Sequence, residues 1–213
     1  MALTAKEDKK IISVLGSTGD FRMTVPEGTE GAKKREYETS DGKTGSKYEL
    51  AFKSIGGKIV DVSFFEGDYG KNVMVTFDFE DDSDHVTASF GCNTPFGEDV
   101  MKKLPNINLN DWVVFSPYAF TDDRGKDRKG VSITQGDVKI QNFFTEVKTD
   151  KNGKNTYKNL HGYPEPTGNE EDADDWKIYF TLCRKFLVKY TEENILPQFG
   201  KTAKPDVSEE EGF

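Results

Sequence analysis

Basic and aromatic side chains alternate through the middle of this sequence, and that combination can hold a single strand of nucleic acid. Cations follow the phosphates, while exposed rings stack on the bases. The residues gather in and before two segments, "EGDYGKN" at 66–72 and "TDDRGKDRKG" at 121–130. Each ring has a competing interpretation as core, and each loop cation as ordinary solvated surface; three aspartates dilute the second segment. The candidate binding residues are Lys53, Lys58, Phe65, Tyr69, Lys71, Tyr118, Phe120, Arg124, Lys126, Arg128 and Lys129.

Sequence patterns for catalysis and metal binding are missing. His85 and His161 have no cysteine or second histidine at the spacing of a metal site. The segment 40–47 contains Gly-Lys-Thr, but a phosphate-binding loop would need glycine where Tyr37 stands. Residues 150–155 lack the glycine and glutamate of a calcium loop. We therefore predict no catalytic residue, no metal, no cofactor and no enzymatic activity; a small hydrolase using a carboxylate pair stays open as an alternative.

The negative charge of the chain is concentrated in two short blocks. The formal net charge is −9, of which "EEDADD" at 170–175 carries five charges and the segment 206–213 carries four. The rest of the chain therefore sums to zero. Its basic residues are free to form a patch that attracts a polyanion.

Alternating apolar residues predict strands across 48–144, with Gly56-Gly57 marking a hairpin or a sharply coiled first strand. A short helix that ends before Pro105 separates three strands from the last two. This order is that of a five-stranded Greek-key barrel of the oligonucleotide/oligosaccharide-binding type (OB-type), although a β-sandwich fits nearly as well. In such a barrel the segments 66–72 and 121–130 flank the binding face.

The complete prediction is a mainly β fold with α elaboration, namely the OB-type barrel, an extra hairpin and a long C-terminal helix. Residues 1–47 are expected to form an N-terminal extension and a flexible loop, and 48–144 the nucleic-acid-binding barrel. Residues 145–199 hold a hairpin turning on Asn152-Gly153 and a helix packed on the barrel. Residues 200–213 are expected to be a disordered acidic tail.

Cysteine content and hydropathy favour a cytoplasmic location. Cys92 and Cys183 lie in apolar segments and are expected to be buried free thiols. The sequence shows no N-terminal signal and no run of 18 apolar residues, so no membrane association is expected.

The acidic segment ends in phenylalanine, and this ending carries a family resemblance. A barrel-like body with basic loops and such a tail resembles a phage-type single-stranded DNA-binding protein. Gly212 stands where bacterial members have proline, and no long Gly/Gln-rich linker precedes the tail, which favours the phage type. The tail residues that carry the resemblance are Asp206, Glu209, Glu210, Glu211 and Phe213.

The resemblance implies a role in DNA replication, recombination or repair, in the host cytoplasm for a bacteriophage protein. The body would coat exposed single strands, and the tail would recruit partners such as polymerase, helicase or primase. The tail also mimics a polyanion, so it is expected to fold back onto the DNA-binding face until DNA displaces it. The chain would act as a monomer or a homodimer. An OB-type module that binds RNA, sugar or protein is the alternative.

Overall fold

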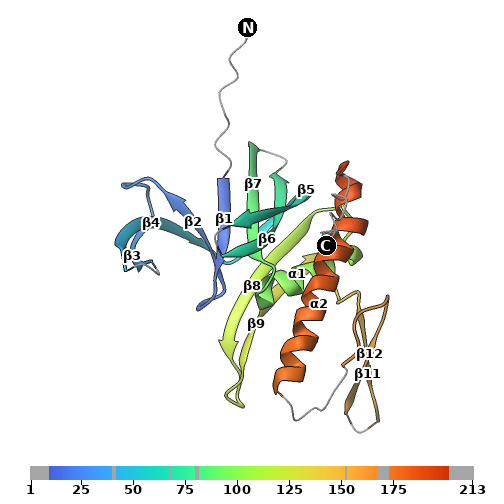
Figure 1. Ribbon diagram of the computed structural model, residues 1–213. Coiled ribbons are helices and arrows are strands. Elements are labelled where there is room, and N and C mark those ends of the chain that lie inside the picture. Colours follow the sequence, from blue (N-terminus) through green and yellow to red (C-terminus); the bar gives the residue numbers. More distant parts are fainter. Residues whose placement is uncertain are drawn as a thin grey trace, which may run out of the picture.

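A ten-stranded mixed sheet and two helices form most of the molecule (Figure 1). The structure is a computed structural model that describes residues 10–39, 42–67, 69–79, 82–151, 153–166 and 173–201. The strand order in the sheet is β10-β9-β8-β5-β6-β7-β1-β2-β4-β3. The strands are β1 (Lys10–Leu15), β2 (Asp20–Val25), β3 (Lys33–Glu38), β4 (Thr44–Phe52), β5 (Ile55–Gly67), β6 (Gly70–Phe79), β7 (Asp82–Gly91), β8 (Val113–Thr121), β9 (Asp127–Gln135) and β10 (Val138–Lys139).

The sheet does not close, so the prediction of a five-stranded OB-type barrel is wrong. Closure would require the outer edge of β7 to meet the outer edge of β9. Instead, β7 pairs in parallel with β1, with Lys10 opposite Val86. The edge of β9 at Val131 is bonded by side chains of the helix α1 (Pro95–Lys103), which occupies the place where another strand would have to pair.

Strand β5 changes partner at the two glycines that the sequence singled out. Its residues Ile55–Gly57 pair with β8, whereas Lys58 to Gly67 pair with β6. A Cβ atom on Gly57 would lie 2.7 Å from the carbonyl oxygen of Asp78, so only glycine permits this close approach. The glycines therefore allow one strand to serve both halves of the sheet.

Residues 1–47, predicted to form an N-terminal extension and a flexible loop, contain strands β1, β2 and β3 and the start of β4, all of them part of the ten-stranded sheet. All six side chains of β3 are exposed, so no apolar alternation marks it as a strand. Backbone pairing with β4 holds it instead, from Lys33 opposite Glu49 to Glu38 opposite Thr44. Strands β2, β3 and β4 project to one side of the molecule (Figure 1).

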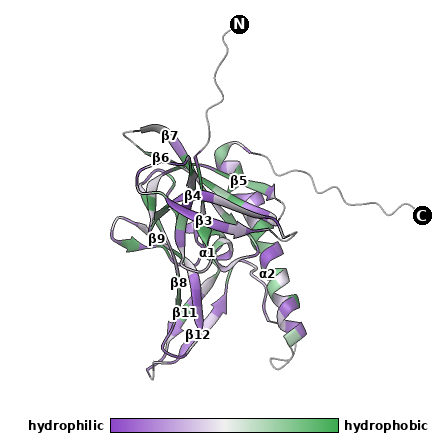
Figure 2. Cartoon of the chain, turned by 90° about the vertical axis from the view of Figure 1, so that its left-hand side faces the viewer, coloured by the Kyte–Doolittle hydropathy of each residue, from purple (hydrophilic) through white to green (hydrophobic). Residues whose placement is uncertain are grey.

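The C-terminal elements agree with their local sequence patterns. Strands β11 (Thr145–Thr149) and β12 (Asn155–Asn159) form the predicted hairpin. The long helix α2 (Ala173–Asn194) lies on the opposite side of the molecule from β3 and presents a mixed surface, with hydrophobic residues interspersed among hydrophilic ones (Figure 2). Its buried residues are Cys183, Leu187 and Thr191. Two short 3-10 helices, η1 (Leu104–Asn106) and η2 (Leu196–Phe199), follow α1 and α2.

Aromatic side chains fill the core between the sheet and the helices. Phe21, Phe77, Phe90 and Phe115 are almost completely buried, and the rings of Phe77 and Phe115 meet edge to face at 5.1 Å. A second group, including Phe144, joins α2 to the segment that follows β10. Within the described ranges, no helix has the length and apolar character needed to cross a membrane.

Candidate nucleic-acid interface

The hairpin of β8 and β9 displays two neighbouring aromatic rings. Tyr118 and Phe120 are two residues apart on β8, so their side chains share one face of the strand. Their ring centroids are 5.8 Å apart, and the residues are 38% and 56% exposed. Arg128 lies opposite Phe120 on β9, so its side chain emerges on the same face of the hairpin. This surface, Tyr118 with Phe120 and Arg128, is called the hairpin patch below.

Gly130 makes room for the first ring of the hairpin patch. It lies opposite Tyr118, and a Cβ atom there would be 2.6 Å from the tyrosine hydroxyl oxygen. The ring therefore lies over the glycine backbone. Partial burial, together with the nearby carboxylate of Asp99, raises the pKa of Tyr118, so this ring stays neutral at ordinary pH.

Asp122 orders the loop that joins the two strands. Its carboxylate accepts hydrogen bonds from the backbone N–H groups of Arg124 and Lys126, at 3.0 and 2.9 Å, and from Nε of Arg128 at 2.8 Å. The bond from Lys126 and that from Arg128 lower the pKa of Asp122, so the carboxylate stays ionised. Within the described part of the chain, the side chains of Arg124 and Lys126 have no ion-pair partner. Asp122 lowers the net positive charge of this segment, but its hydrogen bonds also fix the loop that carries Arg124 and Lys126.

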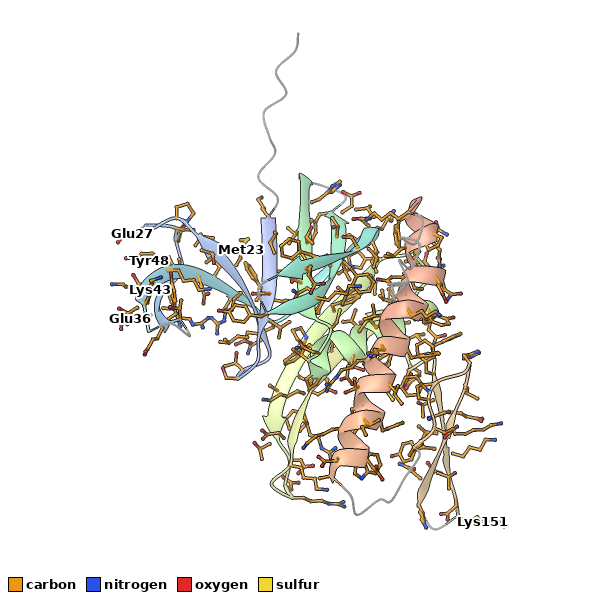
Figure 3. The ribbon with its side chains drawn as sticks, viewed as in Figure 1. Met23, Glu27, Glu36, Lys43, Tyr48 and Lys151 are labelled. Carbon is orange, nitrogen blue, oxygen red and sulfur yellow. The ribbon has the colours of Figure 1, made fainter. Side chains whose placement is uncertain are left out.

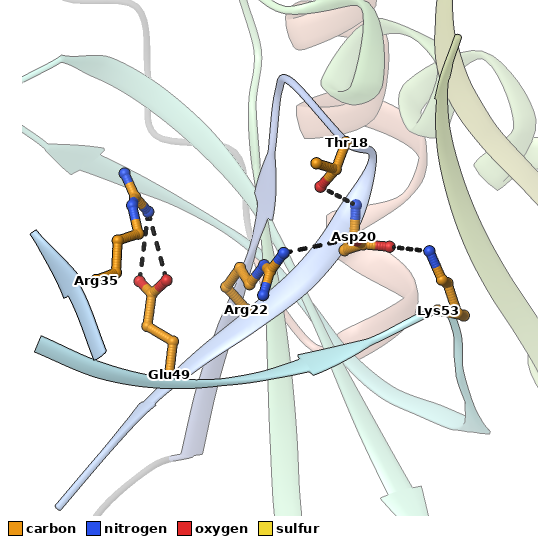
Figure 4. Close-up of polar contacts among 6 residues, drawn as sticks. All are labelled: Thr18, Asp20, Arg22, Arg35, Glu49 and Lys53. Carbon is orange, nitrogen blue, oxygen red and sulfur yellow. Dashed lines mark hydrogen bonds and ion pairs between the residues drawn. The ribbon is translucent and has the colours of Figure 1, made fainter. Parts of the chain in front are cut away.

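Lys53 flanks the hairpin through its contact with Asp20, the first residue of β2. Its ammonium bonds Asp20 at 2.6 Å, and Asp20 also accepts a bond from Arg22 at 3.3 Å (Figure 4). The next residue back, Gly19, packs directly on the backbone of Tyr118 and Ala119. The bond from Lys53 is the main cause that lowers the pKa of Asp20, against the opposing effect of burial. Lys129 projects from the opposite face of β9 to Arg128.

The other predicted binding residues lie elsewhere. Lys71 bonds Glu192, near the C-terminal end of α2, at 2.7 Å and lies over the ring of Phe64. Phe65 and Tyr69 are exposed at the same turn, which lies at the far side of the molecule from the β8–β9 loop (Figure 1). Lys58 lies within β5, opposite Asp78. The two loops expected to flank one binding face are therefore separated in the structure.

An apolar groove of about 480 Å³ opens beside Lys53, and sequence reasoning missed it. Its walls come from six strands and the turn before β5, so no local pattern could have grouped them. Phe52 and Ser54, the chain neighbours of Lys53, both line the groove. The other lining residues are Lys10, Ile12, Met23, Ile55, Gly56, Phe79 and Val86.

The described residues hold no cluster of metal-ligating side chains, and their two cysteines are buried. No group of three or more His, Cys, Asp or Glu side chains there could hold a metal ion. Cys92 and Cys183 are buried and free, as expected, and burial raises the pKa of Cys92 to about 12. Such a thiol is not a nucleophile at neutral pH. The ring of His161 stacks on Phe143 at 3.9 Å.

Comparisons with protein-family models, with curated proteins and with solved structures find no match to this chain.

Proposed function

We propose that this protein binds single-stranded DNA through the hairpin patch and coats exposed strands in replication, recombination or repair. The observation that carries the proposal is the pair of exposed rings of Tyr118 and Phe120, 5.8 Å apart on one strand face, with Arg128 opposite. Free bases stack on such rings, while bases in a duplex are already stacked on each other. The surface therefore favours single strands.

The cations around the rings supply the second part of the interaction. Arg124 and Lys126 project from an ordered loop, and Lys53 flanks the hairpin on the side of the β1–β2 turn. When the phosphates of a DNA strand bind these cations, the counterions condensed on the DNA are released, so binding should weaken as salt is added. RNA offers the same phosphates and similar flat bases, with uracil in place of thymine. The experiment below therefore measures the affinity for RNA relative to that for DNA.

The acidic segment 206–213 lies outside the described residues, and its role is part of the proposal. Its carboxylates compete with phosphates for the cations of the β8–β9 loop, and its charge steers it to basic surfaces of partners such as polymerase, helicase or primase. Removing 206–213 is therefore expected to tighten DNA binding at low salt. We place this activity in the cytoplasm, which is the host cytoplasm for a phage protein.

The deciding experiment measures the affinity for fluorescently labelled oligo-dT by anisotropy, with unlabelled duplex and oligo-U as competitors. Phe120→Ala is expected to weaken binding by roughly 1–3 kcal/mol, the contribution of one stacked base. Phe65→Ala is the matched control, because Phe65 is equally exposed but lies at the far turn. Equal affinities for the two variants, or no binding by the unchanged protein, would reject the hairpin patch as the DNA site.

A further inference from the structure

Strand β3 ends the ten-stranded sheet with an edge that carries no partner in the described part of the chain. It pairs with β4 alone, and all six of its side chains are exposed. Glu36 lies at the outer side of the projecting strands, far from α2 (Figure 3). A second chain can therefore reach this edge without meeting the body of the molecule.

Strand β3 lacks the geometric protections of an edge strand and carries charge instead. Proteins shorten edge strands, bulge them, insert proline or place charged residues on them, lysine above all, so that they do not pair with other chains. The charges of β3, Lys33 and Lys34 among them, disfavour most partner strands but not one of complementary charge. The opposite end of the sheet, β10, has only two residues. By contrast, β3 has six residues, contains no proline and pairs with β4 through six pairs without a register shift. It can therefore accept another strand along its whole length.

The charges of β3 are arranged in opposite halves. Its sequence, KKREYE, begins with three cations and ends with Glu36, Tyr37 and Glu38. An antiparallel second copy brings the basic half of one strand toward the acidic half of the other. From this complementarity we infer that β3 pairs with β3 of a second copy of this chain, which joins the two sheets across a two-fold axis.

Symmetry restricts the register of this pairing. The axis runs perpendicular to the joined sheet, and directly opposite residues must point to the same face. Both conditions hold only when one residue lies opposite its own copy. With Arg35 at the axis, Lys34 of each copy lies opposite Glu36 of the other, and Lys33 lies opposite Tyr37. Opposite charges in such cross-strand positions stabilise the pairing.

The neighbouring contacts favour Arg35 over Glu36 at the axis. Arg35 already bonds Glu49 of its own β4 at 3.4 Å, and Glu49 also accepts Lys47 at 2.7 Å (Figure 4 shows the Arg35 contact). Two Arg35 side chains at the axis are therefore partly neutralised. Glu36 lies opposite the uncharged Ser46, so two Glu36 carboxylates at the axis would repel each other with no cation opposite them on β4.

Charge exchange tests the pairing in the absence of DNA, so the outcome does not depend on the proposed DNA binding. Sedimentation of the full chain over a range of protein concentrations should show a monomer–dimer equilibrium. Lys34→Glu and Glu36→Lys should each weaken the dimer, because like charges then lie opposite one another. The double exchange should restore the dimer, and a mixture of the two single variants should form the mixed dimer. The matched control exchanges Lys148 and Glu146, two residues apart on β11, and should change nothing.

Cysteine cross-linking tests the register. Opposed residues have Cα atoms about 4.5–5.5 Å apart, within disulfide reach. Arg35→Cys should therefore give a covalent dimer on oxidation, whereas Glu36→Cys should not, since two Glu36 residues would be roughly 8 Å apart. The native cysteines are buried and do not compete. A chain that stays monomeric at low salt, a dimer insensitive to both exchanges, or failure of Arg35→Cys to cross-link would overturn the inference.

Discussion

The carboxylate of Asp99 in α1 accepts the backbone N–H of Val131 in β9 at 2.7 Å. Lys103, one turn further along α1, donates to the carbonyl oxygen of the same residue at 2.5 Å and to Asp99 at 2.8 Å. Both backbone groups of Val131 on the outer edge of β9 are thus satisfied by side chains. A helix takes the place that a neighbouring strand would need, which is why the sheet stays open there.

Replacing Asp99 with alanine should destabilise the protein by about 3 kcal/mol. The change leaves the Val131 N–H without an acceptor and the ammonium of Lys103, a residue only 8% exposed, without its carboxylate. Urea unfolding followed by circular dichroism measures the effect. Lys177→Ala, which breaks an exposed ion pair with Asp174, is the control and should cost less than about 1 kcal/mol. Similar losses for both variants would contradict the role assigned to Asp99.

Gly57→Ala should also destabilise the fold, through a steric conflict rather than a broken bond. The new methyl group would lie 2.7 Å from the carbonyl oxygen of Asp78 and 3.1 Å from Cβ of Phe77. Relief requires β5 and β6 to separate, at a cost of about 1–3 kcal/mol. Gly16→Ala is the matched control, since no atom lies within 4 Å of its new methyl group. Thermal unfolding of the two variants should therefore differ clearly, and equal midpoints would show that the strands absorb the methyl group.

Removing the loop cations should make DNA binding less sensitive to salt, while the stacking of bases on Tyr118 and Phe120 should remain. Arg124→Gln and Lys126→Gln each remove a charge that the backbone bonds to Asp122 hold near the hairpin patch. For single strands, the slope of log affinity against log salt should become shallower by about 0.7 for each phosphate that the variant no longer neutralises. The measurement is a salt titration of oligo-dT binding. Lys151→Gln, on the β11–β12 hairpin, should leave the slope unchanged (Figure 3).

Local sequence patterns predicted the strands and helices in which apolar residues recur at a regular spacing along one buried face. Alternation marked β6, three- and four-residue spacing marked α2, and Asn152-Gly153 marked the turn of the β11–β12 hairpin. Strand β3 has no buried face, so its residues carry no such signal. Element type could therefore be predicted where one face is buried, and not where backbone pairing alone holds the strand.

Long-range contacts decided the features that the sequence could not show. The sheet stays open because β1 pairs with β7 and because Asp99 bonds Val131 at the edge of β9. No local sequence pattern encodes either contact. The candidate site divides in the same way. Tyr118 and Arg128 are near each other because one hairpin contains both, whereas the distance between that hairpin and Tyr69 depends on the complete topology. Composition could identify the cations and rings but not which of them share a surface.

The pair formed by Asp20 and Lys53 should make stability depend on pH in acid. The bond from Lys53, with further contributions from Thr18 and Arg22, lowers the pKa of Asp20 from its ordinary value of 3.8, against the opposing effect of burial. The folded state thus binds this proton less readily than the unfolded state. The stabilisation is complete above the ordinary value and is lost as the pH falls through the lower folded pKa.

Asp20→Asn should therefore lower the free energy of unfolding by about 1 kcal/mol near neutral pH, and this deficit should shrink below about pH 4. Lys53→Met removes the same pair from its exposed partner, so its smaller deficit should disappear over the same pH range. Urea unfolding at a series of pH values gives both curves, and a deficit that persists unchanged into strong acid would show that the carboxylate charge is not what stabilises this turn.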